Sequence, residues 1–124
     1  MIKLLLVDNQ TQVRRGLQMR LHLEPDMRVV GEADNGATAL TLIQELQPDV
    51  VLLDLEMWRL DGLATLASLG ESGWPGAIVV LSLHDDEVTL KRVLSAGAAA
   101  FVSKQAGDVP LLAAIRRAVE NRAN

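Results

Sequence analysis

The stretch Val50-Val51-Leu52-Leu53-Asp54 sets four consecutive apolar residues directly before a carboxylate. A continuous apolar run of this length is typical of a strand that is buried on both faces of a parallel sheet. Two other segments share the pattern: Leu4–Val7 ends at Asp8, and Ala77–Leu81 ends at Ser82. We therefore predict three central strands, each followed at once by a polar side chain.

Two weaker apolar segments complete the predicted set of strands. Arg28–Ala33 is interrupted by Arg28 and Glu32, while Ala99–Val102 is short and ends near Lys104. Polar interruptions and a short length suit the edge of a sheet, where one side of the strand has no neighbouring strand. We predict these two segments as edge strands.

Between the strands, apolar residues recur at the spacing of an α-helix. This period predicts five helices, at residues 13–21, 39–46, 63–70, 85–96 and 111–119. Gly97 stands where a left-handed cap is expected, and Asp61-Gly62 is typical of a turn. Asp108 is predicted as an N-cap, with Pro110 in the first turn of the last helix. Alternating strands and helices indicate a parallel sheet covered on both faces, with right-handed crossovers.

The chain has 124 residues, which is the size of one domain. It contains no cysteine, so a disulfide scaffold, a zinc ribbon and a thiol nucleophile are excluded. A formal net charge of −4, with only two tryptophans and one phenylalanine, argues against direct nucleic-acid binding. No apolar run approaches the ~18 residues of a membrane span, and the N-terminus has no signal-peptide pattern. We therefore expect a cytoplasmic protein without membrane contact.

Polar side chains are predicted to meet at one edge of the sheet. The residues that follow four different strands are Asp8, Asp54, Ser82 and Lys104. Ligands of open parallel sheets bind outside the carboxyl ends of the strands, so the four residues together favour a site there. Each one alone has an ordinary explanation, because a strand-end Asp is often only a turn former or helix cap. Glycine-rich phosphate motifs are absent, which argues against a nucleotide site.

Motifs along essentially the whole chain are similar to those of a known family. They are Leu5–Asn9, Val51–Met57, Asp61-Gly62, Leu81-Ser82, Ala96–Ala98 and Phe101–Lys104. In this order and spacing they resemble the receiver domain of bacterial two-component response regulators. The segments Val30–Gly36 and Leu111–Arg117 look most like the NarL/LuxR-type subfamily. Its members usually carry a C-terminal helix-turn-helix domain that binds DNA.

The resemblance implies a single flavodoxin-like (βα)5 domain over residues 1–124, with a five-stranded parallel sheet in the order 2-1-3-4-5. It implies a signalling module rather than an enzyme, one that at most promotes its own phosphoryl transfer and dephosphorylation. Its partner would be a sensor histidine kinase, and pairing with a second copy of the chain stays open. DNA would be contacted only through a helix-turn-helix domain, which we expect to follow Asn124 in a longer protein.

The resemblance also implies roles for the residues at the sheet edge. Asp54 would accept a phosphoryl group from the kinase and form an aspartyl phosphate. Lys104 would pair with the phosphoryl oxygens as a point charge, and Ser82 would donate a hydrogen bond to them. Phe101 would change rotamer as Ser82 moves towards the phosphoryl group, so that Ser82 and Phe101 form a two-state switch.

The cofactor that the resemblance implies is Mg²⁺. Asp8, Asp54 and the backbone carbonyl of Glu56 would hold it, because Mg²⁺ prefers hard oxygen ligands. The family usually has a second acid after the first strand, where this chain has Asn9. Asn9 offers the metal a carbonyl oxygen but no charge. We therefore expect weaker Mg²⁺ binding and slow or conditional phosphorylation.

Two further departures from the family lie beside the expected acceptor. Trp58 replaces the usual proline, which is expected to change the loop and to place a large apolar group near the mouth of the pocket. Leu83 replaces a smaller residue and is expected to restrict access to the site or the movement of Phe101. With Asn9, they leave open a degenerate receiver that works by protein–protein contact without phosphorylation. A stand-alone response regulator is another alternative. A flavodoxin-like FMN protein is a third, although the chain lacks a Ser/Thr-rich first loop.

Overall fold

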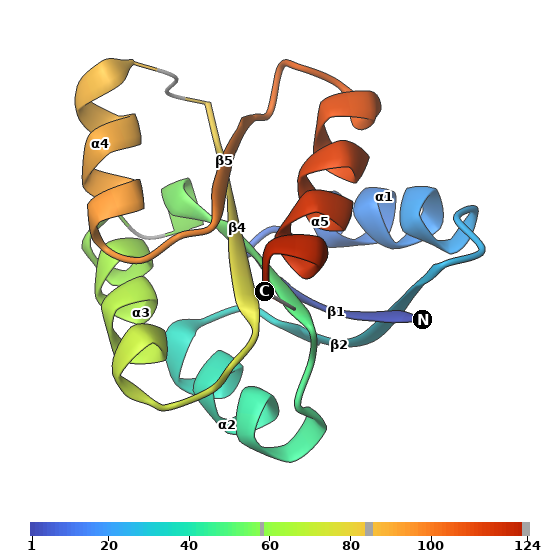
Figure 1. Ribbon diagram of the computed structural model, residues 1–124, viewed down its shortest axis with the longest axis horizontal. Coiled ribbons are helices and arrows are strands. Elements are labelled where there is room, and N and C mark those ends of the chain that lie inside the picture. Colours follow the sequence, from blue (N-terminus) through green and yellow to red (C-terminus); the bar gives the residue numbers. More distant parts are fainter. Residues whose placement is uncertain (58, 84–85, 123–124) are drawn as a thin grey trace.

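A computed structural model describes residues 1–57, 59–83 and 86–122. Strands and helices alternate along the chain (Figure 1). The strands are β1 (Ile2–Val7), β2 (Met27–Ala33), β3 (Val50–Asp54), β4 (Ala77–Ser82) and β5 (Ala100–Ser103). The α-helices are α1 (Thr11–His22), α2 (Gly36–Leu46), α3 (Arg59–Glu71), α4 (Glu87–Ser95) and α5 (Asp108–Arg122), and a short 3-10 helix, η1 (Leu55–Met57), follows β3.

The strands form one parallel sheet in the order β2-β1-β3-β4-β5, which confirms the predicted fold. All five predicted strands form, with ends that differ by one or two residues. For example, β1 begins at Ile2, whose N–H donates a hydrogen bond to the Asp26 carbonyl at 2.7 Å. The strand order reverses between β1 and β3. The loops that leave these two strands therefore flank the place where open parallel sheets bind ligands.

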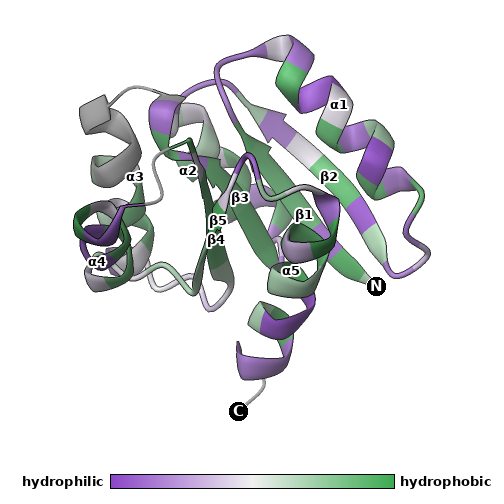
Figure 2. Cartoon of the chain, turned by 90° about the horizontal axis from the view of Figure 1, so that it is seen from above, coloured by the Kyte–Doolittle hydropathy of each residue, from purple (hydrophilic) through white to green (hydrophobic). Residues whose placement is uncertain are grey.

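Helices cover both faces of the sheet, because successive side chains of a buried strand point to opposite faces. One face packs against α1 and α5 through a cluster that includes Leu6, Leu52 and Ile115. The other face packs against α2, α3 and α4 through a cluster that includes Val7 and Leu53. Figure 1 shows these two helical layers, and Figure 2 shows the central strands as the most hydrophobic part of the chain. No described helix is long and apolar enough to cross a lipid bilayer.

Polar side chains begin two of the helices. The Asn35 side chain accepts a hydrogen bond from the Thr38 N–H at 2.7 Å where α2 begins. Asp86 accepts one from the Thr89 N–H at 3.1 Å where α4 begins. Both are N-caps, which satisfy backbone donors that the helix itself cannot. After α4, Gly97 has a φ of 111°, and this confirms the predicted left-handed position.

Two predicted helix starts are wrong. The Asp61-Gly62 pair lies inside α3, which begins at Arg59, so these residues do not form a separate turn. Local turn preference is a weak signal that tertiary packing overrides, and α3 buries Leu66 and Leu69 in the core. The last helix begins at Asp108 rather than after it. The Asp108 carboxylate accepts a hydrogen bond from Arg20 Nε at 2.8 Å, so an ion pair with α1 occupies the expected capping group.

Arg20 and Arg116 join α1 and α5 to the turn before β2. Arg20 Nη1 lies 2.9 Å from Glu24 Oε2, and Arg116 contacts both Glu24 Oε1 at 2.7 Å and Asp26 Oδ2 at 2.9 Å. Hydrogen bonds from Arg20 and Arg116 lower the pKa of Glu24, and the one from Arg116 lowers the pKa of Asp26. From sequence alone, both arginines are predicted on solvated helix faces, with an association surface on the last helix as the alternative. Both remain partly exposed, but they also form this network.

Candidate functional site

The carboxyl edge of the sheet brings the four predicted polar residues together. Their positions follow from the parallel pairing of β1 with β3, of β3 with β4 and of β4 with β5. In addition, the Lys104 N–H donates a hydrogen bond to the Ser82 carbonyl at 2.8 Å. The residues Asp8, Asp54 and Ser82 are only 2%, 3% and 0% exposed. Burying two carboxylates costs folding free energy unless each is paired, so their presence at this edge marks a candidate site.

Asp54 is held by partners from two directions. Lys104 Nζ lies 2.7 Å from Asp54 Oδ1, and the Glu56 backbone N–H donates to the same oxygen at 3.0 Å. Burial raises the pKa of Asp54 to about 6; the hydrogen bond from Lys104 opposes this rise, and the charge of Asp8 adds to it. The carboxyl group is therefore mostly ionised at neutral pH, with one oxygen already oriented by a cation.

Asp8 organises the loop after β1. Its Oδ1 accepts a hydrogen bond from the Gln10 N–H at 2.8 Å, and its backbone carbonyl accepts one from Arg14 Nη1 at 2.5 Å. Arg14 Nε in turn pairs with Glu32 Oε1 at 3.1 Å. The turn-forming explanation of Asp8 thus accounts for Oδ1 only. Asp8 Oδ2 is buried and has no hydrogen-bond partner within the described ranges.

The side chain of Glu56 is a member of the site that sequence reasoning missed. Its Oε1 accepts hydrogen bonds from Ser82 Oγ at 2.6 Å and from the Leu83 N–H at 2.7 Å. Its Oε2 lies 4.0 Å from Lys104 Nζ. Burial alone would raise the pKa of Glu56, but the hydrogen bonds from Ser82 and Leu83 outweigh it and lower the pKa. The only available signal was an acid two residues after a strand-end aspartate.

The unpartnered Asp8 Oδ2 fits a bound cation. It is a hard oxygen, it lies beside the buried Asp54 carboxylate, and Mg²⁺ prefers such ligands. In the part of the chain that the structure describes, no three acidic or histidine side chains are grouped to hold a metal ion. A metal at this edge would therefore complete its shell with amide, carbonyl and water oxygens, as Mg²⁺ commonly does. Asn9, exposed next to Asp8, is a candidate amide ligand.

The remaining predicted residues lie around this cluster. Phe101 is partly buried and packs with the core that faces α2, α3 and α4. Leu83 is 52% exposed. Its N–H binds Glu56, and its effect on the entrance to the site and on Phe101 stays a prediction. Trp58 lies outside the described residues.

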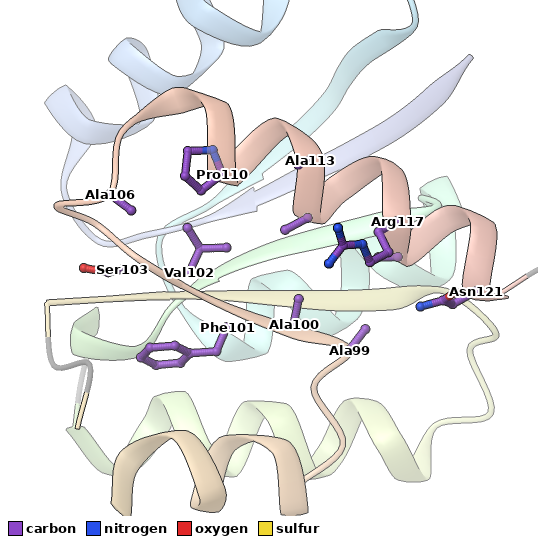
Figure 3. A pocket seen from close by; sticks show the side chains of 12 residues that line it. Ala99, Ala100, Phe101, Val102, Ser103, Ala106, Pro110, Ala113, Arg117 and Asn121 are labelled. Atoms are coloured by element: carbon purple, nitrogen blue, oxygen red, sulfur yellow. The ribbon is translucent and has the colours of Figure 1, made fainter. Parts of the chain in front are cut away.

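A separate groove runs between β5 and α5 (Figure 3). Small apolar residues such as Ala100, Val102 and Ala113 line it, with Arg117 among its polar residues. Figure 3 shows the Phe101 ring on the side of β5 away from α5. Neither buried aspartate lines this groove, so it is distinct from the acidic edge of the sheet.

Comparison with known proteins agrees with the fold. Residues 4–116 match the response regulator receiver domain. The chain is 37% identical over 115 residues to the nitrate/nitrite response regulator protein NarL of Escherichia coli K12. It is 40% identical over 119 residues to the transcriptional regulatory protein LiaR of Bacillus subtilis 168. These alignments cover 93% and 95% of this chain but only 53% and 56% of the relatives, so it spans about half their length.

Solved structures show the same likeness. A LuxR-family two-component response regulator from Aurantimonas sp. SI85-9A1 has a TM-score of 0.90 at 26% identity, over 97% of this chain and 86% of that one. The response regulator domain of Thermotoga maritima CheB has a TM-score of 0.86 at 30% identity, over 97% of both chains. The fold and the relatives agree, and the chain belongs to the response regulator receiver domain family, among its NarL/LuxR-type members.

Proposed function

We propose that residues 1–124 form one receiver domain in which Asp54 accepts a phosphoryl group from a sensor histidine kinase. The observation that carries the proposal is the pairing of this buried carboxylate with Lys104, 2.7 Å away, at the switch point of the sheet. A carboxylate that is ionised, oriented and shielded from bulk water is suited to act as a nucleophile.

The reaction moves one phosphoryl group between two proteins. An oxygen of Asp54 forms a bond to phosphorus as the bond from phosphorus to the imidazole nitrogen of the kinase breaks, and the histidine leaves with its electron pair. Lys104 neutralises charge on the phosphoryl oxygens, and Ser82 donates a hydrogen bond to them. Catalysis of this kind consists of positioning and charge stabilisation.

We assign the cation at this site to Mg²⁺, held by Asp8, Asp54, Asn9 and the backbone carbonyl of Glu56. When bound, it neutralises the negative charge that gathers as a phosphate approaches two carboxylates. The unpartnered Asp8 Oδ2 supports this assignment. Asn9 is neutral where the family usually has an acid, so the affinity for Mg²⁺ is lower than in typical receivers.

The domain serves regulation rather than turnover of a separate substrate. Receiver domains are generally not enzymes themselves; one relative, a protein-glutamate methylesterase of Syntrophomonas wolfei, matches this chain over only 31% of its length. Ser82 and Phe101 form the switch that responds to phosphorylation. We place the chain in the cytoplasm, in a NarL/LuxR-type regulator whose DNA contacts belong to a helix-turn-helix domain, because the relatives include a transcriptional regulatory protein.

Phosphorylation with acetyl phosphate and Mg²⁺, followed by intact-mass measurement, tests the proposal. We expect one phosphoryl adduct on the wild type and none on Asp54→Asn. Glu45→Gln, which alters an exposed carboxylate on α2, is the matched control and should be labelled like the wild type. Label that persists on Asp54→Asn would refute the assignment of the acceptor.

A further inference from the structure

The carboxylate of Glu56 occupies hydrogen-bond donors that a phosphoryl group on Asp54 needs. We propose that Glu56 is a built-in competing anion: it holds the unphosphorylated form of the site and must leave before phosphoryl oxygens can bind Ser82, Leu83 and Lys104. The inference rests on the proposed function of Asp54 and names a regulation of that same site.

Glu56 Oε1 is satisfied by two donors at once. Ser82 Oγ lies 2.6 Å from it and the Leu83 nitrogen lies 2.7 Å from it. Both distances are at the short end for hydrogen bonds, as expected for a charged acceptor. The hydroxyl that should recognise the phosphoryl group is therefore already bound to an internal carboxylate.

Lys104 is positioned between the two acids. Its Nζ lies 2.7 Å from Asp54 Oδ1 and 4.0 Å from Glu56 Oε2. A phosphoryl group on Asp54 carries roughly 1.5 to 2 negative charges at neutral pH, of which about one is a net gain, because the carboxylate loses its own charge when the acyl phosphate forms. Phosphoryl oxygens and the Glu56 carboxylate would repel one another at this short range, and they would compete for the same ammonium and the same hydroxyl.

The Glu56 side chain is less buried than that of Asp54, although its Oε2 atom is itself buried. The Glu56 side chain is 24% exposed, whereas the Asp54 side chain is 4% exposed. Rotation of Glu56 into solvent would release Ser82 and the Leu83 N–H together, because both donate to one oxygen. The exchange of one anion for another is a two-state element that phosphorylation would bias.

The test compares initial rates of phosphorylation by acetyl phosphate at saturating Mg²⁺, followed by intact mass. We expect Glu56→Ala to react roughly ten- to hundredfold faster than the wild type, because two charge-assisted hydrogen bonds no longer have to be broken. Glu56→Gln keeps the shape and one acceptor oxygen but not the charge, so its rate should lie between the two. Equal or slower rates in both variants would overturn the inference.

A matched control separates competition from a general change in charge. Glu87→Gln removes an equal charge from an exposed residue in the first turn of α4, which follows the same edge of the sheet. Its rate should equal that of the wild type. A Glu87→Gln rate that matches Glu56→Gln would mean that Glu56 acts only by repelling the anionic donor, and the inference would be wrong.

A second readout needs no phosphodonor. Amide hydrogen exchange of Leu83 should be faster in Glu56→Ala than in the wild type, because the acceptor of that N–H is gone. Unchanged protection would overturn the inference even if rates differ. If all variants are labelled at the same rate, the inference is wrong but Asp54 remains the acceptor. If neither the wild type nor any variant is labelled, the proposed function is wrong, and the inference with it.

Discussion

Lys104 Nζ lies 2.7 Å from Asp54 Oδ1 although their strands are not neighbours in the sheet. β4 separates β3 from β5, and the loop after β5 carries the lysine back across the end of β4. The Lys104 N–H anchors this loop on the Ser82 carbonyl at 2.8 Å. The ion pair and this hydrogen bond thus connect three strands: β3, which carries Asp54, β4, which carries Ser82, and β5, which Lys104 follows.

The ionised Asp54 should make the fold less stable at neutral pH than in mild acid. Its pKa is raised from 3.8 to about 6, chiefly by burial. A group whose pKa is raised by folding favours the folded state below its unfolded pKa, and that advantage is lost as the pH rises through the folded pKa. The contribution of Asp54 to the stability of the fold therefore falls between about pH 4 and about pH 6.

Asp54→Asn should accordingly be more stable than the wild type at pH 7. The gain is at most about 3 kcal/mol, from 1.36 kcal/mol for each pKa unit, and the loss of a charged partner for Lys104 reduces it. Urea unfolding at pH 7 and pH 4 measures the effect, and the difference should shrink at pH 4. A variant that is less stable than the wild type at pH 7 would contradict it.

Arg116→Met should destabilise the fold at neutral pH more than Arg117→Met does. Arg116 pairs with Glu24 and Asp26, whereas Arg117 is the exposed neighbouring arginine. Folding lowers the pKa values of both carboxyl groups. The stability that they contribute is therefore present at a pH above their ordinary pKa values, and it is lost as the pH falls through their pKa values in the folded protein. Thermal unfolding should show the two variants converging in strong acid and in high salt. Equal stability at neutral pH would be evidence against the network.

Gly76→Ala should destabilise the fold by about 1–3 kcal/mol through overpacking. A Cβ at residue 76 would lie only 1.9 Å from Cζ2 of Trp74. The ring cannot move freely, because its Nε1–H donates to the Pro48 carbonyl at 2.9 Å and it packs against the core. Gly70→Ala is the control: a Cβ there meets no atom within 4 Å inside α3, so the change should be neutral or stabilising by up to about 1 kcal/mol. Urea unfolding followed by circular dichroism distinguishes the two, and similar effects would reject this explanation.

Asn9→Asp should bind Mg²⁺ at least about tenfold more tightly than the wild type, because a second charged ligand would stand beside Asp8. Isothermal titration calorimetry measures the affinity directly. Gln10→Glu adds the same charge at the next position and is the control for long-range attraction. If it raises the affinity as much as Asn9→Asp does, residue 9 is not a ligand.

Most of the fold could be predicted from local patterns. The apolar runs before Asp8, Asp54 and Ser82 indicate strands that are buried on both faces, and such strands occur at the centre of a parallel sheet. Errors occurred where local chemistry favoured two outcomes. Asp61-Gly62 suits a turn, yet it lies inside α3. Asp108 suits a cap, yet its carboxylate binds Arg20 on another helix.

The sequence by itself determined which residues end the strands, and parallel topology then required their side chains to meet at one edge. Only the tertiary structure decided which partner each side chain takes. Glu56 binds Ser82 and the Leu83 N–H, 26 and 27 residues further along the chain, and no periodic pattern encodes that choice. Periodicity depends on burial of neighbouring residues, whereas a hydrogen bond depends on distances of a few ångströms between segments that only the complete fold brings together.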